Sequence, residues 1–198
     1  MHKWPEGVHV SRETEEKLFA FVSLLEKWNP RINLVSSKDI ENVWSRHVLD
    51  SLQLVPLIQG QSRFIDMGSG GGFPAVVVGI ATGIPGVLIE SDQRKAAFLR
   101  EVARLTQTNL EVLPCRLESV KVQPAPVVTA RALAPLVKLL EWTHPLLQPE
   151  GKAIFLKGQQ AVQEIQDAEQ VWQMDVQAYP SQTSSDGMIL EVRNFNRV

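Results

Sequence analysis

Apolar residues return every three or four positions in the first part of the chain. Between Ser11 and Trp28 this spacing is combined with acidic residues near the start, which predicts an amphipathic helix that ends near Asn29-Pro30. A second helix is predicted over 37–55, with Ser36 and Asp39 as a capping pair. The chain therefore begins with a helical segment.

From residue 63 onward, short apolar runs alternate with helical patterns. The expected strands are 63–67, 86–90, 111–115, 126–130 and 152–157, and the expected helices are 74–82, 94–106, 134–147 and 160–172. Such alternation is typical of a parallel sheet with helices on both faces and ligands at the carboxyl ends of the strands. Segments near 174–179 and 188–195 flank Ser-Ser-Asp-Gly and predict a hairpin at an antiparallel edge.

These elements predict an α/β fold with a doubly wound, mostly parallel, seven-stranded sheet. Residues 1–58 are expected to form a helical extension packed on a second unit, 59–198, that contains the sheet. At 198 residues with 44% hydrophobic side chains, the chain has enough apolar material for one ample core.

Charge and cysteine content narrow the function classes. The net charge of -2 excludes a globally basic coat, so any RNA binding must come from local patches. The single cysteine, Cys115, excludes an intramolecular disulfide, and no run of about 18 apolar residues suggests a membrane span. We expect a soluble, cytoplasmic protein without a membrane partner.

The richest motif follows the first predicted strand of the sheet. Glycines there fall in the register Asp66-x-Gly68-x-Gly70-x-Gly72, which is typical of methyltransferases that use S-adenosylmethionine. A dinucleotide site needs Gly-x-Gly-x-x-Gly, and counting from Gly68 puts Phe73 at the third glycine. Counting from Gly70 puts Ala75 there, a small residue that is sometimes allowed, so an NAD-dependent oxidoreductase stays the alternative.

The other strand ends offer further candidate residues. Glu90 ends the second strand, 24 positions after Asp66, where a carboxylate suits the two hydroxyls of a ribose. Leu117 and Glu118 follow the third strand and are placed to flank an adenine. Arg131 directly follows the fourth strand and Lys157 ends the fifth, which gives two cations able to face phosphate.

Candidates for chemical catalysis are few. His47 lies on the border of the apolar face of the second helix, and Arg46 and Asp50 are four residues apart, which suits an ion pair. Cys115 is interpreted as a small buried residue inside the third strand. No His/Cys spacing suggests a metal site, and no nucleophile–base arrangement is evident. We therefore expect an acceptor that is already nucleophilic.

Taken together, these blocks resemble the bacterial ribosomal RNA small subunit methyltransferase G family, also called the glucose-inhibited division protein B family. The similarity extends over nearly the whole chain and rests on 27–29 with 33–34, Arg46-His-Val-Leu-Asp-Ser51, 63–74, 95–100, Arg131-Ala132 and 156–158. It implies methylation of guanine N7 in a decoding-region loop of 16S rRNA. The implied partners are 16S rRNA or the small ribosomal subunit and its assembly intermediates. The protein itself is expected to be a monomer. A non-catalytic ribosome-assembly factor is a third possible function, besides the methyltransferase and the oxidoreductase.

The resemblance also implies roles for individual residues. Cofactor contacts fall on Gly68, Phe73, Leu117, Glu118 and Arg131, with Glu90 at the ribose. Arg46, His47, Arg131 and Lys157 are expected to hold phosphates, and Glu118 or Asp50 to stabilise the cationic product. Guanine N7 carries a lone pair in the neutral base, so alignment of the reactants is sufficient without a general base. The chain departs from the family pattern at Gly71 and Ala75, which puts cofactor affinity in question.

Overall fold

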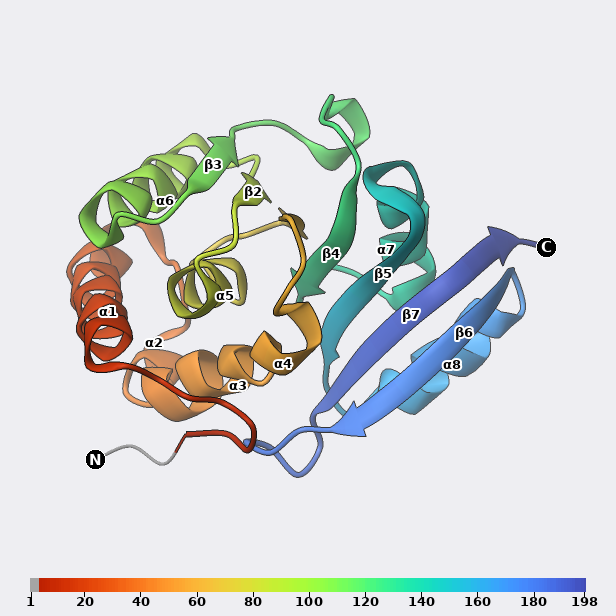
Figure 1. The fold of residues 1–198 in the computed structure, drawn as a ribbon, viewed down its shortest axis with the longest axis horizontal. Coiled ribbons are helices and arrows are strands. Elements are labelled where there is room, and N and C mark those ends of the chain that lie inside the picture. Colours follow the sequence, from red (N-terminus) through yellow and green to blue (C-terminus); the bar gives the residue numbers. More distant parts are fainter. Residues whose placement is uncertain (1–3) are drawn as a thin grey trace.

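Five parallel strands and a C-terminal antiparallel hairpin form one seven-stranded sheet (Figure 1). The computed structural model describes residues 4–198. The strands are β1 (Phe64–Met67), β2 (Gly86–Ile89), β3 (Leu110–Leu113), β4 (Ala125–Arg131), β5 (Leu147–Lys157), β6 (Trp172–Pro180) and β7 (Met188–Arg197). Their order is β3-β2-β1-β4-β5-β7-β6, with β7 antiparallel to both of its neighbours. The predicted doubly wound α/β fold and its hairpin edge are confirmed.

Helices cover both faces of this sheet. They are α1 (Arg12–Ile32), α2 (Ser37–Ile40), α3 (Leu49–Leu52), α4 (Val55–Ile58), α5 (Ala75–Thr82), α6 (Gln93–Thr106), α7 (Leu136–Thr143) and α8 (Ala161–Glu169). One apolar cluster, which includes Phe21 and Phe98, joins α1 and α3–α6 to the first face. A second, which includes Leu140 and Phe155, joins α7 and α8 to the opposite face. Each fully buried side chain of this size contributes about 1.5–3 kcal/mol.

The strand order determines where a ligand is expected. The chain moves outward from β1 to β3 and then returns to place β4 beside β1. In such sheets the crevice at the carboxyl ends of the strands, where the order reverses, is the usual binding position. The ends of β1, β2 and β4 are thus brought together.

The first helix is longer than expected. It continues through Pro30 to Ile32 instead of ending near Asn29-Pro30, because a proline in the last turn removes only one helical hydrogen bond. Asn33 then takes a left-handed conformation, with φ 50°. The Asn29 side chain accepts hydrogen bonds from the N–H groups of Leu34 and Val35 at 2.8 and 2.9 Å, which fixes the exit of the helix.

The prediction of one continuous helix over 37–55 is wrong. Ser36 does cap the start through Asp39, but the segment divides into α2, a π-helical turn at Trp44–Val48, α3 and α4. A π turn closes i to i+5 and therefore changes which side chains share a face. Asp39, not Asp50, is accordingly the ion-pair partner of Arg46, at 2.8 Å.

Smaller differences concern the ends of elements. β3 ends at Leu113, so Cys115 lies beyond the strand and is only partly buried, contrary to its expected place inside it. Helix α7 ends at Thr143, and a short 3-10 turn leads directly into β5. α1 packs against α5 and α6, whereas the division into units 1–58 and 59–198 stays a prediction.

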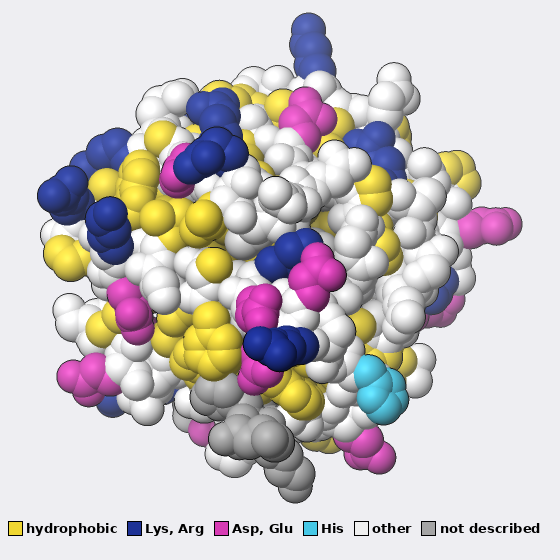
Figure 2. Space-filling model, turned by 60° about the vertical axis from the view of Figure 1, so that its left-hand side comes forward, with side chains coloured by type: hydrophobic (Ala, Val, Ile, Leu, Met, Phe, Trp, Pro, Cys, Tyr) yellow, Lys and Arg dark blue, Asp and Glu magenta, His cyan; other side chains and the backbone are white. Residues whose placement is uncertain are grey.

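Charges of both signs share the face that carries α1 and α6. Figure 2 shows Lys and Arg side chains interspersed there with Asp and Glu, and apolar atoms between them. Over residues 4–198, no helix is long and apolar enough to cross a bilayer.

Candidate functional site

The glycine loop between β1 and α5 follows a path that side chains would obstruct. Gly68, Gly70 and Gly72 have φ values of 65°, 50° and 94°, which L-residues rarely adopt. A Cβ atom on Gly68 would lie 2.6 Å from Leu133 Cδ1, and one on Gly72 would lie 2.8 Å from Val76 Cγ2. The backbone of the loop, free of side chains, can therefore lie directly against a ligand in the crevice beside β4.

Glu90 connects this loop to the end of β2. Its Oε2 accepts a hydrogen bond from the Gly70 N–H at 2.8 Å, and its Oε1 accepts one from the Asp92 N–H at 2.7 Å. Each carboxylate oxygen keeps a further lone pair. Glu90 is thus held in place by backbone groups and still able to accept from a diol.

Asp66 supports the loop from below and does not line the crevice. It is 1% exposed and accepts hydrogen bonds of 2.6 Å from the hydroxyls of Ser69 and Thr129. Burial raises the pKa of Asp66 to about 7, although these two hydrogen bonds oppose the shift. Gly72 is likewise outside the crevice, packed near Phe21 and Val76.

The crevice holds a first cavity of about 460 Å³, within the range of small-molecule sites. Its lining includes the predicted residues Gly68, Gly70, Phe73, Glu90, Leu117, Glu118 and Arg131, together with His47. Leu34, Val35, Lys95 and Trp142 also line it and were not predicted. The Asn29 side chain, through the N–H groups of Leu34 and Val35, shapes this wall from the far end of α1.

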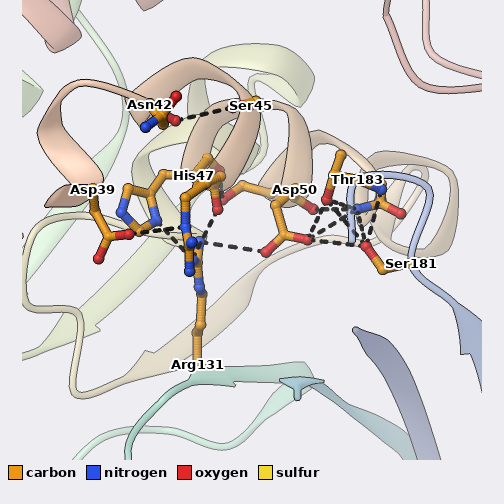
Figure 3. Close-up of polar contacts among 11 residues, drawn as sticks. Asp39, Asn42, Ser45, His47, Asp50, Arg131, Ser181 and Thr183 are labelled. Atoms are coloured by element: carbon orange, nitrogen blue, oxygen red, sulfur yellow. Dashed lines mark hydrogen bonds and ion pairs between the residues drawn. The ribbon is translucent and has the colours of Figure 1, made fainter. Parts of the chain in front are cut away.

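Arg131 lies at the end of β4, between His47 and Asp50 (Figure 3). Its Nη2 donates to the Arg46 carbonyl at 2.9 Å and contacts His47 Nδ1 at 2.6 Å. Its Nη1 faces Asp50 Oδ2 at 3.5 Å as an ion pair without a hydrogen bond. The Arg131 side chain, 18% exposed, therefore joins the π-helical turn to the sheet.

His47 is held in one protonation state by this contact. Because the guanidinium donates to Nδ1, the imidazole must be neutral, with its proton on Nε2. Burial, reinforced by the charge of Arg131, lowers the pKa of His47 to about 4. The ring stacks on Phe73 at 4.9 Å. A neutral, buried His47 offers no positive charge to a phosphate, in contrast to the role expected from sequence.

Three buried donors on residues that line the first cavity have no hydrogen-bond partner among residues 4–198. They are His47 Nε2, the Trp142 indole nitrogen and Arg131 Nη1, which only faces Asp50 as an ion pair. A buried donor without a partner costs about 1–3 kcal/mol, and a polar ligand removes that cost. These donors and Glu90 suit a ligand that carries both hydroxyl or amino groups and acceptor atoms.

A second cavity of about 410 Å³ adjoins the first and shares Arg131 and Ala132 with it. Its other lining residues are Arg46, Asp50, Leu156, Lys157, Gly158, Glu164, residues 183, 184 and 187 of the β6–β7 connection, and Met188 at the start of β7. Asp50 Oδ1 accepts from the Thr183 hydroxyl at 2.9 Å, which fastens that connection to α3. The predicted positioning residues Arg46, Asp50 and Lys157 thus meet here.

Lys157 is not a solvated cation. Its Nζ lies 2.6 Å from Glu164 Oε2 and donates to the Ala134 carbonyl at 2.9 Å. Glu164, on α8, is absent from the residues that sequence indicated, because a glutamate on an amphipathic helix carries no distinguishing signal. Within residues 4–198, no group of three or more His, Cys, Asp or Glu side chains is arranged to hold a metal ion.

Two solved structures with a similar fold contain SAH or AdoMet. An O-methyltransferase from Bacillus cereus in complex with SAH aligns over 96% of this chain and 94% of its own, with a TM-score of 0.58 and 17% identity. M. jannaschii TYW2 in complex with AdoMet aligns over 83% and 78%, with a TM-score of 0.59 and 13% identity. At these identities the likeness shows a shared class I methyltransferase fold.

Sequence comparison is more specific. The family described as GidB, rRNA small subunit methyltransferase G, matches residues 14–189. A relative of that name from Gluconobacter oxydans is 51% identical over 189 residues, 96% of this chain and 98% of its own length. One from Granulibacter bethesdensis is 51% identical over 195 residues, 98% and 92% of the two chains. The chain belongs to the ribosomal RNA small subunit methyltransferase G family.

Proposed function

We propose that this chain transfers a methyl group from S-adenosylmethionine to N7 of a guanine in the decoding-region loop of 16S rRNA. Family membership makes it a methyltransferase of small-subunit ribosomal RNA that uses S-adenosylmethionine. The observation that carries the residue assignments is the pair of adjoining cavities that meet at Arg131. The first holds the donor and the second holds the acceptor base.

The lining of the first cavity fits S-adenosylmethionine. Glu90 accepts from the ribose hydroxyls, and Leu117 with Ile89 provides apolar surface for the adenine. Glu118 accepts from the adenine amino group, and the free N–H of His47 or Trp142 donates to an acceptor atom of the cofactor. When bound, the cofactor supplies an electrophilic methyl group.

The residues at the acceptor need to bind and orient rather than to remove a proton. Guanine N7 attacks with the lone pair of its neutral form, so positioning supplies the catalysis, and well-oriented reactants gain about 7–11 kcal/mol. Arg131 fixes the boundary between the cavities, because its guanidinium is held on three sides. Asp50 pairs with Arg131 in the wall of the second cavity, which supports its proposed role of stabilising the cationic product.

Local charge supports an RNA partner in spite of the net charge of -2. Three of the five charged side chains at the second cavity are cationic: Arg46, Arg131 and Lys157. Arg46 is the most open to solvent, at 58%, and is the best placed to meet a phosphate. We further propose that the protein acts as a monomer in the cytoplasm. Its substrate is either naked 16S rRNA or an assembly particle of the small subunit.

The decisive experiment maps N7-methylguanosine in 16S rRNA by mass spectrometry, in cells with and without the gene. We expect one modified guanine to lose its methyl group and to regain it when purified protein and S-adenosylmethionine are added to the isolated small subunits. An unchanged inventory would defeat the proposal. Cofactor binding by calorimetry with no transfer to RNA or particles would instead favour a non-catalytic assembly factor, and binding of NAD alone an oxidoreductase.

A further inference from the structure

Glu164 is held rigidly in the wall of the second cavity. Its Oε2 accepts from the Leu136 backbone N–H at 2.7 Å and pairs with Lys157 Nζ at 2.6 Å. The side chains of Glu164 and Lys157 are only 17% and 8% exposed. Three separate elements, the start of α7, the end of β5 and the first turns of α8, therefore fix one carboxylate.

The second oxygen of Glu164 is available to a ligand. In the part of the chain that the structure describes, Oε1 makes no hydrogen bond or ion pair, so both of its lone pairs remain. The other carboxylate in this cavity is differently placed. Asp50 Oδ1 accepts from Thr183, Gln53 and Ser181, and its Oδ2 faces Arg131. Of the two carboxylates, Glu164 is therefore the one that has an oxygen free to accept hydrogen bonds from a ligand.

A fixed carboxylate oxygen distinguishes guanine from the other bases. Guanine presents two neighbouring donors, N1–H and the exocyclic amino group, on the edge remote from N7. Adenine presents an acceptor at N1, which a carboxylate repels. Hydrogen bonds to a charged group are worth about 1.5–3 kcal/mol, or roughly 10- to 150-fold in binding.

We infer that Glu164 selects guanine as the acceptor by taking hydrogen bonds from N1–H and the amino group through Oε1, with Lys157 as its positioning residue. The inference rests on the proposed function. It also gives Glu164 a part in the rate: as N7 accepts the methyl group, the ring becomes cationic and N1–H more acidic. The hydrogen bond to Glu164 then strengthens toward the transition state, which raises kcat and not only affinity.

The test compares acceptor bases in wild type and in Glu164→Gln. In the variant, Lys157 and the Leu136 N–H keep the amide oxygen, which turns the amide NH₂ toward the cavity and against the guanine donors. Small subunits are reconstituted with 16S rRNA carrying guanosine or inosine at the modified position. Inosine keeps N7 and N1–H and lacks only the amino group.

For wild type we expect kcat/KM to be about 10-fold or more higher for guanosine than for inosine. Glu164→Gln should lower kcat/KM for guanosine by about 10- to 100-fold, mostly in kcat, and bring the guanosine-to-inosine ratio near 1. Glu169→Gln, an exposed glutamate further along α8, is the matched control and should change neither value. Affinity for S-adenosylmethionine and the urea midpoint report whether the variant is folded.

The outcomes separate the inference from the function it rests on. If wild type forms no N7-methylguanosine, the proposed function fails. If wild type methylates guanosine but Glu164→Gln, folded and binding the cofactor, keeps the wild-type ratio of guanosine to inosine, Glu164 is only a structural partner of Lys157 and the inference is overturned. A wild-type ratio near 1 overturns it without any variant.

Discussion

The two cavities that meet at Arg131 are built in different ways. The first takes its shape from backbone: glycines at 68 and 70 in left-handed conformations, and Glu90 held by two N–H groups. The second is built from side chains of many elements: the π-helical turn, α3, β4, β5, α8, the β6–β7 connection and the start of β7. Its walls depend on ion pairs such as Lys157–Glu164 and Arg131–Asp50.

This contrast separates a general function from a particular one. The glycine loop belongs to the fold, which this chain shares with solved structures that are only 13% and 17% identical to it. Side chains from distant segments suit one acceptor. Arg131 belongs to both cavities, so changing it tests whether they form one unit.

The largest effect is expected for Arg131→Met. The change removes the ion pair with Asp50 and the contacts to His47 and the Arg46 carbonyl, and breaking a mostly buried pair costs about 3–5 kcal/mol. Methyl transfer should fall by about 100-fold or more, because both walls shift. Urea unfolding and transfer of labelled methyl groups to small subunits measure the two losses.

Arg193→Met is the matched control for that change. Arg193 pairs with Glu191 at 2.8 Å on β7, away from both cavities, and is 43% exposed. Such a pair contributes at most about 1 kcal/mol, and methyl transfer should stay at the wild-type rate. Equal losses of methyl transfer in the two arginine variants would mean that Arg131 has no structural role shared by the two cavities.

The contrast between the cavities also explains what the sequence could predict. The glycine loop and Glu90 are local signals, since positive φ values require glycine and a strand end places its own residue at the crevice. The second cavity depends on pairing across the chain. A helix over 37–55 was expected, but the π turn is fixed by Arg131, some 84 positions beyond His47, which no periodicity indicates. Glu164 has the same sequence signature as the exposed Glu169.

The next largest effect tests the backbone-built cavity alone, through Gly68→Ala. An alanine here must adopt a φ near 65°, and its Cβ displaces Leu133, which itself lines the first cavity. We expect a loss of about 1–3 kcal/mol in the free energy of unfolding, and affinity for S-adenosylmethionine about 10-fold lower by calorimetry.

Gly83→Ala separates backbone strain from the site. Gly83 has a φ of 69°, but its Cβ would meet nothing within 4 Å. This control should lose about 1 kcal/mol of stability and keep its affinity for S-adenosylmethionine. If Gly68→Ala binds the cofactor as well as Gly83→Ala does, the close approach at Gly68 has no part in the first cavity.

The pH dependence of the free energy of unfolding distinguishes the Asp66 carboxyl, beneath the glycine loop, from the His47 imidazole, beside Arg131. The pKa of His47 is about 4 when folded and 6.5 as its ordinary value, so between these pH values the unfolded chain binds more protons and stability rises with pH. The pKa of Asp66 is about 7 when folded and ordinarily 3.8, so stability falls as pH rises from about 4 to 7. In wild type the two trends oppose each other.

Removing one group should uncover the other trend. His47→Gln should lose stability as pH rises from 4 to 7, and Asp66→Asn should gain stability from 4 to 6.5, each with a slope of up to about 1.4 kcal/mol per pH unit. Urea midpoints at half-unit pH intervals measure both slopes. Parallel curves for the two variants would contradict the assignment of opposite trends.

The smallest effect is expected at the entrance to the second cavity, for Arg46→Gln. The pair with Asp39 joins two side chains that are 58% and 23% exposed, so its loss should change stability by less than about 1 kcal/mol. RNA affinity should weaken a few-fold, and the slope of log affinity against log salt should fall by about 1, because one phosphate contact is lost. Arg104→Gln is the control: Arg104 pairs with Glu101 near the end of α6, and α6 returns from the carboxyl edge of the sheet to the opposite edge. A salt slope equal in both variants and wild type would show that Arg46 does not meet the RNA, and that side chains deeper in the second cavity bind the acceptor without it.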